Sequence, residues 1–349
     1  MKRKDYILKL IVQHFIKTAQ PVGSKTLIEE YDLQYSSATI RSEMNALEQE
    51  GLLEKTHTSS GRVPSSQGYQ YYISNLRDSN INEEIKHRIQ TVLDQKIASI
   101  DEIIKESCEI LAHMTNLASV VLGPDSKQEK LVSIQIIPLS NKSATAVFVT
   151  DQGYVENKTF VINDESSIDD VKECIKLLND RLVGTPVSEL VEKMESIKPL
   201  LSDYIIDHDV VYQALLQTFL RFANDRLETY GKSELLKQPE FANDADKLKK
   251  IIDLLDNPTQ IKQYVKDKKG DGIIVKIGDS ESNDDVSVVS ANISIDGVKE
   301  GTISILGPKR MDYDQVLSTL EYVVAAISNH FDSKKGVKHD GKEGKQKGK

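Results

Sequence analysis

Residues 36–64, SSATIRSEMNALEQEGLLEKTHTSSGRVP, contain a helix pattern followed by a hairpin pattern. Ile40, Met44 and Leu47 lie within about 60° of one another at about 100° per residue, so they form one apolar stripe. Either serine at the start of the stretch can cap the helix, and Gly51 can close it. The stretch therefore predicts an amphipathic helix whose apolar stripe faces a core.

A β-hairpin pattern and two further helix patterns flank this helix. Residues 52–56 and 62–64 read as two short strands, and the polar turn between them contains Gly61. Upstream, apolar residues recur every three or four positions over 4–19, which predicts an amphipathic helix. A short helix is predicted over 24–31, with Ser24 as its cap. Three helices followed by a hairpin are typical of a winged helix-turn-helix.

The outward face of the central helix is small and polar near its start. Its candidate DNA contacts are Ser37, Thr39, Arg41, Ser42 and Asn45. Small polar side chains allow close approach to a major groove and hydrogen bonds to base edges, and one arginine can bind a phosphate or a guanine. The helix alone is equally typical of a face that only meets water. The hairpin that follows favours the DNA-binding interpretation.

The predicted wing carries one cation, Arg62, beside Gly61. An arginine at this position would meet phosphates or the minor groove, so Arg62 completes the candidate DNA-binding set. We expect Arg62 to be exposed, so that its replacement lowers DNA affinity with little effect on stability. His57 in the turn is predicted to pack or hydrogen-bond locally, because no second metal ligand stands at a suitable spacing.

Charge is unevenly distributed along the chain. The 349 residues predict two or three domains at roughly 150 residues per domain. The net charge is −9, yet residues 1–75 hold nine Lys and Arg against eight acids, and residues 334–349 hold seven Lys against two acids. The acidic remainder repels phosphate, so DNA contacts are expected only near the N-terminus or in the tail. The tail is predicted to be a disordered, solvated end, with a non-specific DNA anchor as the alternative.

Several function classes find no support in the sequence. No run approaches the ~18 apolar residues of a membrane span, and no signal peptide is recognisable, so a cytoplasmic protein without membrane contact is predicted. Cys108 and Cys174 are expected to be small buried side chains, with a redox pair as the alternative. No phosphate-binding loop, nucleophile elbow or zinc-protease motif occurs, and Asp207-His208-Asp209 is interpreted as a turn. We therefore expect no enzyme, and no catalytic, cofactor-binding or metal-binding residues.

The rest of the chain predicts a mixed α+β body. An apolar stripe from Ile85 to Leu111 predicts one long helix, which could be a domain strut or a dimer seam. Gly307 to Asp312 reads as a strand-to-helix turn with Asp312 as the helix cap, and a partner contact is considered there. Strands are predicted over 131–139, 144–150, 154–162, 273–277, 286–295 and 301–306, and helices over 166–182, 187–197, 199–229 and 316–331.

Several segments together resemble one known family. QPVGSKTL, SSATIRSEMNALEQEGLLEKTHTSSGRVPS and GYQYYI near the N-terminus, and LVSIQIIPLSNKSATAVFVTDQGYVENKTFVI, LLKQPEF and GTISILGPKRMDYDQVLSTLEYV further along, are similar to the heat-inducible transcription repressor family, HrcA. The resemblance covers nearly all of residues 1–333. Ser42 stands where the family often has Asn, and Gln70 where it often has Arg, which affects one groove contact and one phosphate contact.

The resemblance implies a multidomain α+β organisation. The domains that it predicts are a winged helix-turn-helix over 1–75, a GAF-like domain formed by 76–124 and 228–333, a dimerising domain inserted over 125–227, and the Lys-rich tail over 334–349. The three strands that follow the long helix could belong to either of the two larger domains.

The resemblance also implies a function. We expect a homodimeric repressor that binds an inverted-repeat operator of double-stranded DNA upstream of heat-shock chaperone genes and blocks the promoter sterically. A GroE-type chaperonin is implied as the partner that keeps the repressor folded and is withdrawn by unfolded protein during heat shock. The alternative is a regulator whose GAF-like domain binds a small ligand that switches DNA affinity.

Overall fold

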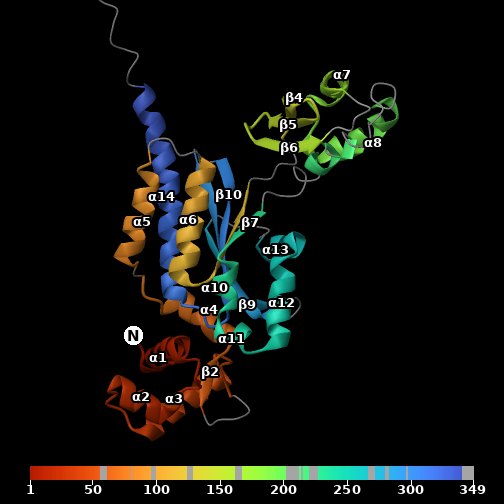
Figure 1. Cartoon of the computed structure of the whole chain (residues 1–349). Helices are drawn as coiled ribbons and strands as arrows, with labels where there is room; N and C mark the ends of the chain where they lie inside the picture. Colours follow the sequence, from red (N-terminus) through yellow and green to blue (C-terminus); the bar gives the residue numbers. More distant parts are fainter. Residues whose placement is uncertain are drawn as a thin grey trace, which may run out of the picture. The chain divides into compact units, whose positions relative to one another are not determined.

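The computed structural model describes residues 1–339 apart from 56–60, 80, 96–99, 124–128, 162–166, 202–211, 214, 220–226, 266–271, 280–282 and 296–297. The chain forms two compact units (Figure 1). The first unit combines Met1–Leu122 with Leu227–Lys349, and the second is Gly123–Arg226. The second unit is therefore an insertion into the first.

The N-terminal module, residues 1–76, has three helices and a hairpin where the sequence predicts them. Ile40, Met44 and Leu47 form the predicted buried stripe, each at most 4% exposed. They pack in one core with the apolar face of the first helix. The elements are α1 (Arg3–Thr18), α2 (Ser24–Tyr31), α3 (Ser37–Gln49), β1 (Leu53–Lys55), β2 (Arg62–Pro64) and α4 (Ser66–Asn75).

Local hydrogen bonds set both ends of α3. Ser36 Oγ accepts a hydrogen bond from the Thr39 amide at 3.1 Å, which confirms a serine cap. After the helix, Gly51 has φ +75°, a left-handed conformation that glycine adopts without strain. The cap predicted at Ser24 is wrong. Gly23 precedes α2 in an extended conformation, and the Ser24 hydroxyl is turned toward α3 instead.

The first unit continues into a five-stranded antiparallel sheet in the order β7-β3-β10-β9-β8, which with its helices we call the body. The strands are β3 (Ala118–Leu122), β7 (Leu227–Tyr230), β8 (Ile273–Asp279), β9 (Asn283–Ile295) and β10 (Val298–Pro308). One apolar core joins the sheet to α5 (Glu83–Leu93), α6 (Ile100–Thr115) and α14 (Tyr313–His339). A second core joins it to α10 (Lys232–Leu236), α11 (Pro239–Ala242), α12 (Ala245–Leu255) and α13 (Pro258–Val265). Helices therefore cover both faces of the sheet (Figure 1).

Four expectations about the body need correction. The single helix predicted from Ile85 to Leu111 is wrong, because α5 ends at Leu93 and α6 packs beside it. The apolar faces of both helices pack against α14, so the spacing of apolar residues in the sequence continues across the break. Residues 118–122 form β3, which is too short to show a period in the sequence. Residues 227–229, predicted as the end of a helix, lie in the strand β7. The expected disordered tail begins as helix, since α14 continues to His339; residues 340–349 lie outside the described residues.

The inserted unit contains a three-stranded antiparallel sheet in the order β4-β5-β6. Its strands are β4 (Leu131–Ser140), β5 (Ser143–Thr150) and β6 (Val155–Val161), followed by α7 (Ile168–Leu182), a short turn of 3-10 helix (Val187–Glu189) and α8 (Leu190–Leu201). Phe148 and Ala146 of β5 share a core with the apolar faces of both helices. The three strands whose domain the sequence leaves open thus lie in the inserted unit.

Both cysteines are free and buried, as predicted. Burial raises the pKa of the Cys108 thiol to about 12 and that of the Cys174 thiol to about 11. Since the thiolate is the reactive form, neither side chain is expected to react readily near neutral pH. Among the described residues, no helix is long and apolar enough to span a membrane, and no cluster of three His, Cys, Asp or Glu side chains could hold a metal ion. Asp207, His208 and Asp209 lie outside those residues.

Candidate nucleic-acid interface

α3 presents five of the six candidate residues. Arg41, Ser42 and Asn45 are exposed, and Ser37 and Thr39 are half-buried near the start of the helix. In Figure 1, α2 and α3 lie at the end of the N-terminal module that points away from the body. The small side chains leave this part of α3 open to close approach by a bulky polar ligand such as a duplex.

A hydroxyl network orients Arg41. Ser24 Oγ of α2 lies 2.9 Å from Ser37 Oγ and accepts a hydrogen bond from Arg41 Nε at 3.3 Å. Because this bond uses Nε, the two terminal nitrogens of the guanidinium remain for a phosphate or a guanine. Ser24, predicted only as a helix cap, therefore positions Arg41 from the neighbouring helix.

Arg62 is not the exposed cation that the sequence predicts. Its residue exposure is 7%, because the side chain lies on β2 against α3. Nε donates to Glu48 Oε2 at 2.8 Å, and Nη2 lies 2.7 Å from the same oxygen. Nη2 also donates to Asn45 Oδ1 at 3.0 Å, which orients the Asn45 amide and leaves its Nδ2 group to donate elsewhere.

The Glu48 carboxylate that binds Arg62 stays ionised. Its partial burial alone would raise the pKa of the carboxyl. Hydrogen bonds from Arg62 and from Lys55, whose Nζ lies 3.3 Å away, outweigh burial and lower the pKa below its usual range. Glu48 is therefore a fixed negative charge that holds Arg62 in place.

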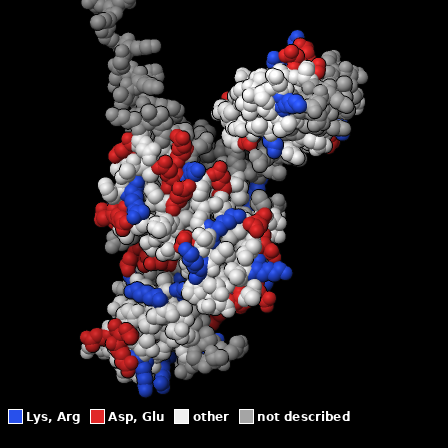
Figure 2. All heavy atoms as spheres, in the orientation of Figure 1, with Lys and Arg blue, Asp and Glu red and all other residues white. Residues whose placement is uncertain are grey.

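Other acidic side chains near α3 are also paired with cations. Glu43 lies 2.5 Å from Arg3, and Glu50 lies 2.7 Å from Lys4. Pairing lowers the negative potential that these acids would present to phosphate. Figure 2 shows cations at the tip of the N-terminal module beside an acidic cluster. This face therefore carries individually placed polar and charged groups rather than a broad basic patch.

The hairpin is fixed to the loop before α2. Val22 and Arg62 exchange backbone hydrogen bonds at 2.8 and 2.9 Å. A Cβ atom on Gly61 would lie 2.8 Å from Pro21 Cβ, so only glycine fits this approach. The turn itself, with His57, falls within residues 56–60, which lie outside the described part of the chain.

Three roles were not visible in the sequence. Ser24 and Glu48 position Arg41 and Arg62 across helix and hairpin contacts. Gln70 of α4 donates from Nε2 to the Val275 carbonyl of β8 at 3.2 Å, so its side chain is engaged by the body. For Glu48 the sequence offered one signal. It lies three residues after Asn45, so the two side chains are neighbours on the same side of the helix, one turn apart.

Known proteins match the chain along most of its length. Residues 101–317 match the family model of the HrcA protein C terminal domain. The heat-inducible transcription repressor HrcA of Bacillus pumilus (strain SAFR-032) is 39% identical over 336 residues, covering 94% of this chain and 96% of that protein. A crystal structure of a hypothetical protein has a similar fold, with a TM-score of 0.65 and 23% identity over 95% of this chain and 99% of the other.

Proposed function

Because the chain belongs to the HrcA family of heat-inducible transcription repressors, we propose that its N-terminal module is a winged helix-turn-helix that binds an operator through α3. The family consists of repressors of heat-shock genes and not of enzymes. The observation that carries the proposal is the exposed face of α3, where Ser24 orients Arg41 and Arg62 orients Asn45. Polar groups that are oriented before binding lose less entropy when DNA is bound.

Each candidate residue has a distinct proposed role. Ser37, Thr39 and Ser42 contact the duplex near the start of α3, where the helix dipole also favours a phosphate. Arg41 binds a phosphate or a guanine, and Asn45 donates from Nδ2 to a base acceptor. Arg62 acts from behind α3 by holding Asn45, instead of meeting DNA as a free wing cation.

Replacing Arg41 by alanine is expected to weaken operator binding. If Arg41 holds a phosphate, the slope of log affinity against log salt should fall by about one unit. If it reads guanine, the loss should fall on one base position and amount to about 1–3 kcal/mol. Titrations at several salt concentrations, with each operator base varied in turn, separate the two cases. Unchanged affinity in a folded variant would mean that α3 does not bind the operator.

The inserted unit is the proposed dimerising domain, and the outer face of its sheet is the proposed contact. One face of the sheet packs on α7 and α8. The opposite face consists of uncharged residues by strand alternation and register: Ser133, Gln135, Ile137, Ser143, Thr145, Val147, Val149, Val155, Asn157, Thr159 and Val161. We call these residues the outer sheet face. Such a face is unusual in a chain with 28% charged residues, and it favours a protein partner.

A second copy of the chain is the partner that this surface fits best. Ile137, Val155 and Val161 are 50%, 51% and 64% exposed, so apolar area remains to be buried. Edge pairing through β4 is partly blocked by Asn179 of α7. Its Oδ1 accepts from the Ile134 amide at 2.8 Å, and its Nδ2 donates to the Ile134 carbonyl at 2.7 Å. Face-to-face packing of two identical sheets around a two-fold axis would bury the exposed apolar side chains of both copies, and it is the arrangement that we propose.

The body, with helices on both faces of an antiparallel sheet, is the proposed GAF-like domain. A dimer on an inverted repeat would block the promoter, and the family resemblance makes a GroE-type chaperonin the partner that maintains the active fold. The protein would act in the cytoplasm, where the chromosome lies.

Operator titration of the full chain tests this function. We propose to select DNA from random duplexes with the protein itself and then to compare the selected site with a scrambled duplex at one salt concentration. Inverted-repeat products and two chains bound per duplex would support the proposal. Selection of no preferred sequence would contradict it. Addition of GroE-type chaperonin should raise the fraction of protein that binds after dilution from denaturant.

A further inference from the structure

The turn after β10 connects the body to the N-terminal module. The predicted strand-to-helix turn and its cap are confirmed, since the Met311 amide donates to the Pro308 carbonyl at 3.0 Å and the Gln315 amide to Asp312 Oδ1 at 3.1 Å. The sequence also allows a partner contact here. That contact stays a prediction. Within the chain, Arg310 of this turn reaches α1.

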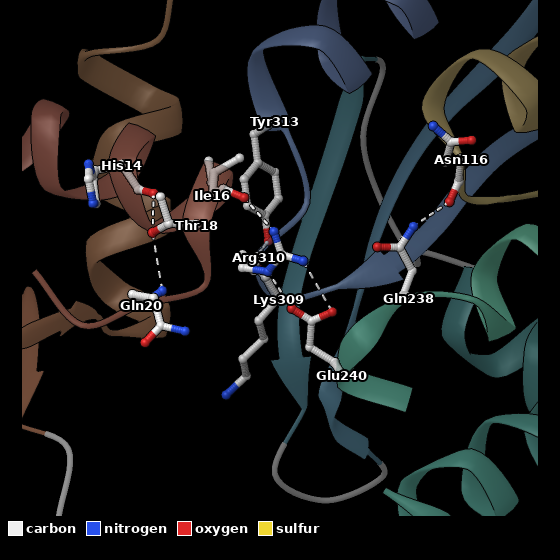
Figure 3. A network of polar contacts seen from close by, with 10 residues as sticks. All are labelled: His14, Ile16, Thr18, Gln20, Asn116, Gln238, Glu240, Lys309, Arg310 and Tyr313. Carbon is white, nitrogen blue, oxygen red and sulfur yellow. Dashed lines mark hydrogen bonds and ion pairs between the residues drawn. The ribbon is translucent and has the colours of Figure 1, made fainter. Parts of the chain in front are cut away.

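Arg310 holds two segments that are far apart in the sequence (Figure 3). Its Nη1 donates to the Ile16 carbonyl in the last turn of α1, and its Nε and Nη2 face the two carboxylate oxygens of Glu240 in α11. The two charged side chains are only 17% and 25% exposed, so water screens the pair less than it would an open surface pair. A planar guanidinium can make both contacts at once, which a lysine ammonium cannot do with the same geometry.

The end of α1 leaves a carbonyl for this contact. The Phe15 carbonyl accepts from the Ala19 amide at 2.9 Å, where Ala19 adopts the left-handed conformation that ends the helix. The next amide, that of Gln20, donates to Thr18 Oγ1 at 3.2 Å (Figure 3). The Ile16 carbonyl is one of the last four of the helix, which lack a partner within it, and a cation there also meets the negative end of the helix dipole.

Glu240 is set in place by the body. Gln238, at the start of α11, donates from Nε2 to the Asn116 carbonyl at 2.6 Å (Figure 3), and Phe241 is buried at 1% exposure. A cleft of about 250 Å³ borders the contact and includes Ile16 and Arg310 in its lining. At this point the module and the body meet through polar groups beside open space, in addition to the apolar core that they share elsewhere.

Other contacts hold α4 and the segment after it. Tyr72 donates to Asp314 Oδ2 at 2.6 Å, and Arg77 Nη2 lies 2.5 Å from Glu321 Oε1. These contacts fix the part of the module that leads directly into the body. Arg310 holds α1, which packs on α3 and so carries the reading helix.

We propose that Arg310 fixes the direction in which α3 faces, and so sets the half-site spacing that the dimer accepts. The inference rests on the proposed function, because spacing has a meaning only for two readers on one duplex. Half-sites recognised by helix-turn-helix dimers lie about 34–36 Å apart or at multiples of this distance, which requires each reader to face a set direction. Loss of the Arg310 contact loosens α1 against the body, so that the module can engage half-sites at other spacings, at an entropic cost for the best one.

The test compares the wild type, Arg310→Ala and a matched control, Arg88→Ala, which removes an arginine from an exposed surface pair on α5. Each protein is titrated with the selected inverted repeat, with the same repeat lengthened by about half a helical turn, and with one half-site. The wild type and Arg88→Ala should bind the lengthened repeat about 100-fold more weakly. Arg310→Ala should reduce this ratio to below about tenfold, with half-site affinity within about twofold of wild type.

Several results would overturn the proposal. One is an Arg310→Ala protein whose ratio of affinities for the selected and the lengthened repeat equals that of the wild type. Another is a wild-type protein that binds both repeats equally well. Should Arg310→Ala fail to fold, Glu240→Gln replaces it, since the neutral amide weakens the same contact. Arg310→Lys should remain closer to Arg310→Ala than to the wild type if the planar guanidinium is required.

A distance measurement without DNA separates this inference from the proposed function. Spin labels at Lys25→Cys and Lys250→Cys, both exposed, report on the module and the body of one copy when labelled chains are diluted with unlabelled ones. The buried native thiols should not take up label. Arg310→Ala should broaden the distance distribution, and an unchanged distribution would exclude the holding role. Broadening together with failure to bind any operator would instead contradict the proposed function alone.

Discussion

Replacing Val155 by aspartate is expected to make the repressor monomeric and to weaken its binding to the two-fold operator by about 10²- to 10⁴-fold. In a symmetric contact each copy contributes the same residues, so a single substitution puts two carboxylates into the interface. Burying an unpaired charge costs roughly several kcal/mol. This cost is larger than the loss of the valine contacts alone. In a monomeric variant the two DNA-binding modules are no longer linked. Binding to the second half-site is then no longer intramolecular, and the gain in affinity from linkage is lost.

The control for this variant is Val183→Asp, because Val183 is 46% exposed and lies outside the outer sheet face, whereas Val155 is 51% exposed and lies on it. Sedimentation gives the oligomeric state of both variants, and a titration with one half-site gives the affinity of a single reader. Half-site affinity should be unchanged in both. A Val155→Asp protein that remains a dimer, with Val161→Asp behaving alike, would move the dimer contact to another surface.

Replacing Arg62 by alanine is expected to lower both stability and operator affinity. Arg62 is buried, and its removal takes one cationic partner from Glu48, which keeps Lys55, and the donor from Asn45 Oδ1. The free energy of unfolding should therefore fall by about 1–3 kcal/mol. Operator affinity should fall by roughly tenfold because the Asn45 amide is no longer oriented. This expectation reverses the one drawn from the sequence, in which an exposed Arg62 would affect binding without affecting stability.

Two comparisons test the positioning role of Arg62. Asn45→Ala should cost less affinity in the Arg62→Ala background than in the wild type, since the two substitutions remove one shared contact. Arg62→Lys keeps the charge without the planar donor set, so it should recover stability only in part. Fully additive effects of Asn45→Ala and Arg62→Ala on affinity would mean that Arg62 supports the hairpin alone.

The Glu48 carboxyl makes the Arg62 contribution dependent on pH. Its pKa in the folded protein lies below the ordinary value of 4.5. A lowered pKa stabilises the fold at pH values above the unfolded pKa, and this stabilisation is lost as pH falls through the folded pKa. Urea unfolding at several pH values should therefore show the difference between wild type and Arg62→Ala shrinking below about pH 4.5. A difference that is constant down to pH 3 would exclude the ion pair as its source.

Local patterns predicted the elements of the fold better than the contacts between them. The α3 stripe, the serine cap and the Gly51 end follow from spacing and backbone conformation within one segment. The break between α5 and α6 was missed because both helices face α14, which leaves the apolar period intact. The short strand β3 has its partners at residues 227–230 and in β10, which no local pattern can indicate.

The candidate interface shows the same division. The polar residues of α3 could be named from one helical face, and their exposure agrees with that pattern. The burial of Arg62 could not be foreseen, because it depends on the side of the hairpin that packs on α3 and on the Val22 contact across 40 residues of sequence. Arg310 likewise acquires its role only when the turn after β10 meets α1 in the fold.

Operator recognition by this protein requires that α3 be the surface that meets the DNA, and affinity cleavage measures this directly. A DNA-cleaving iron chelate attached through Gln34→Cys, an exposed neutral position just before α3, should cut each half-site symmetrically about the dyad. The same chelate attached through Lys250→Cys on α12 should not cut there, and the buried native thiols should carry no chelate. Cleavage from the α12 position and none from Gln34→Cys, in proteins that both bind the operator, would contradict the account.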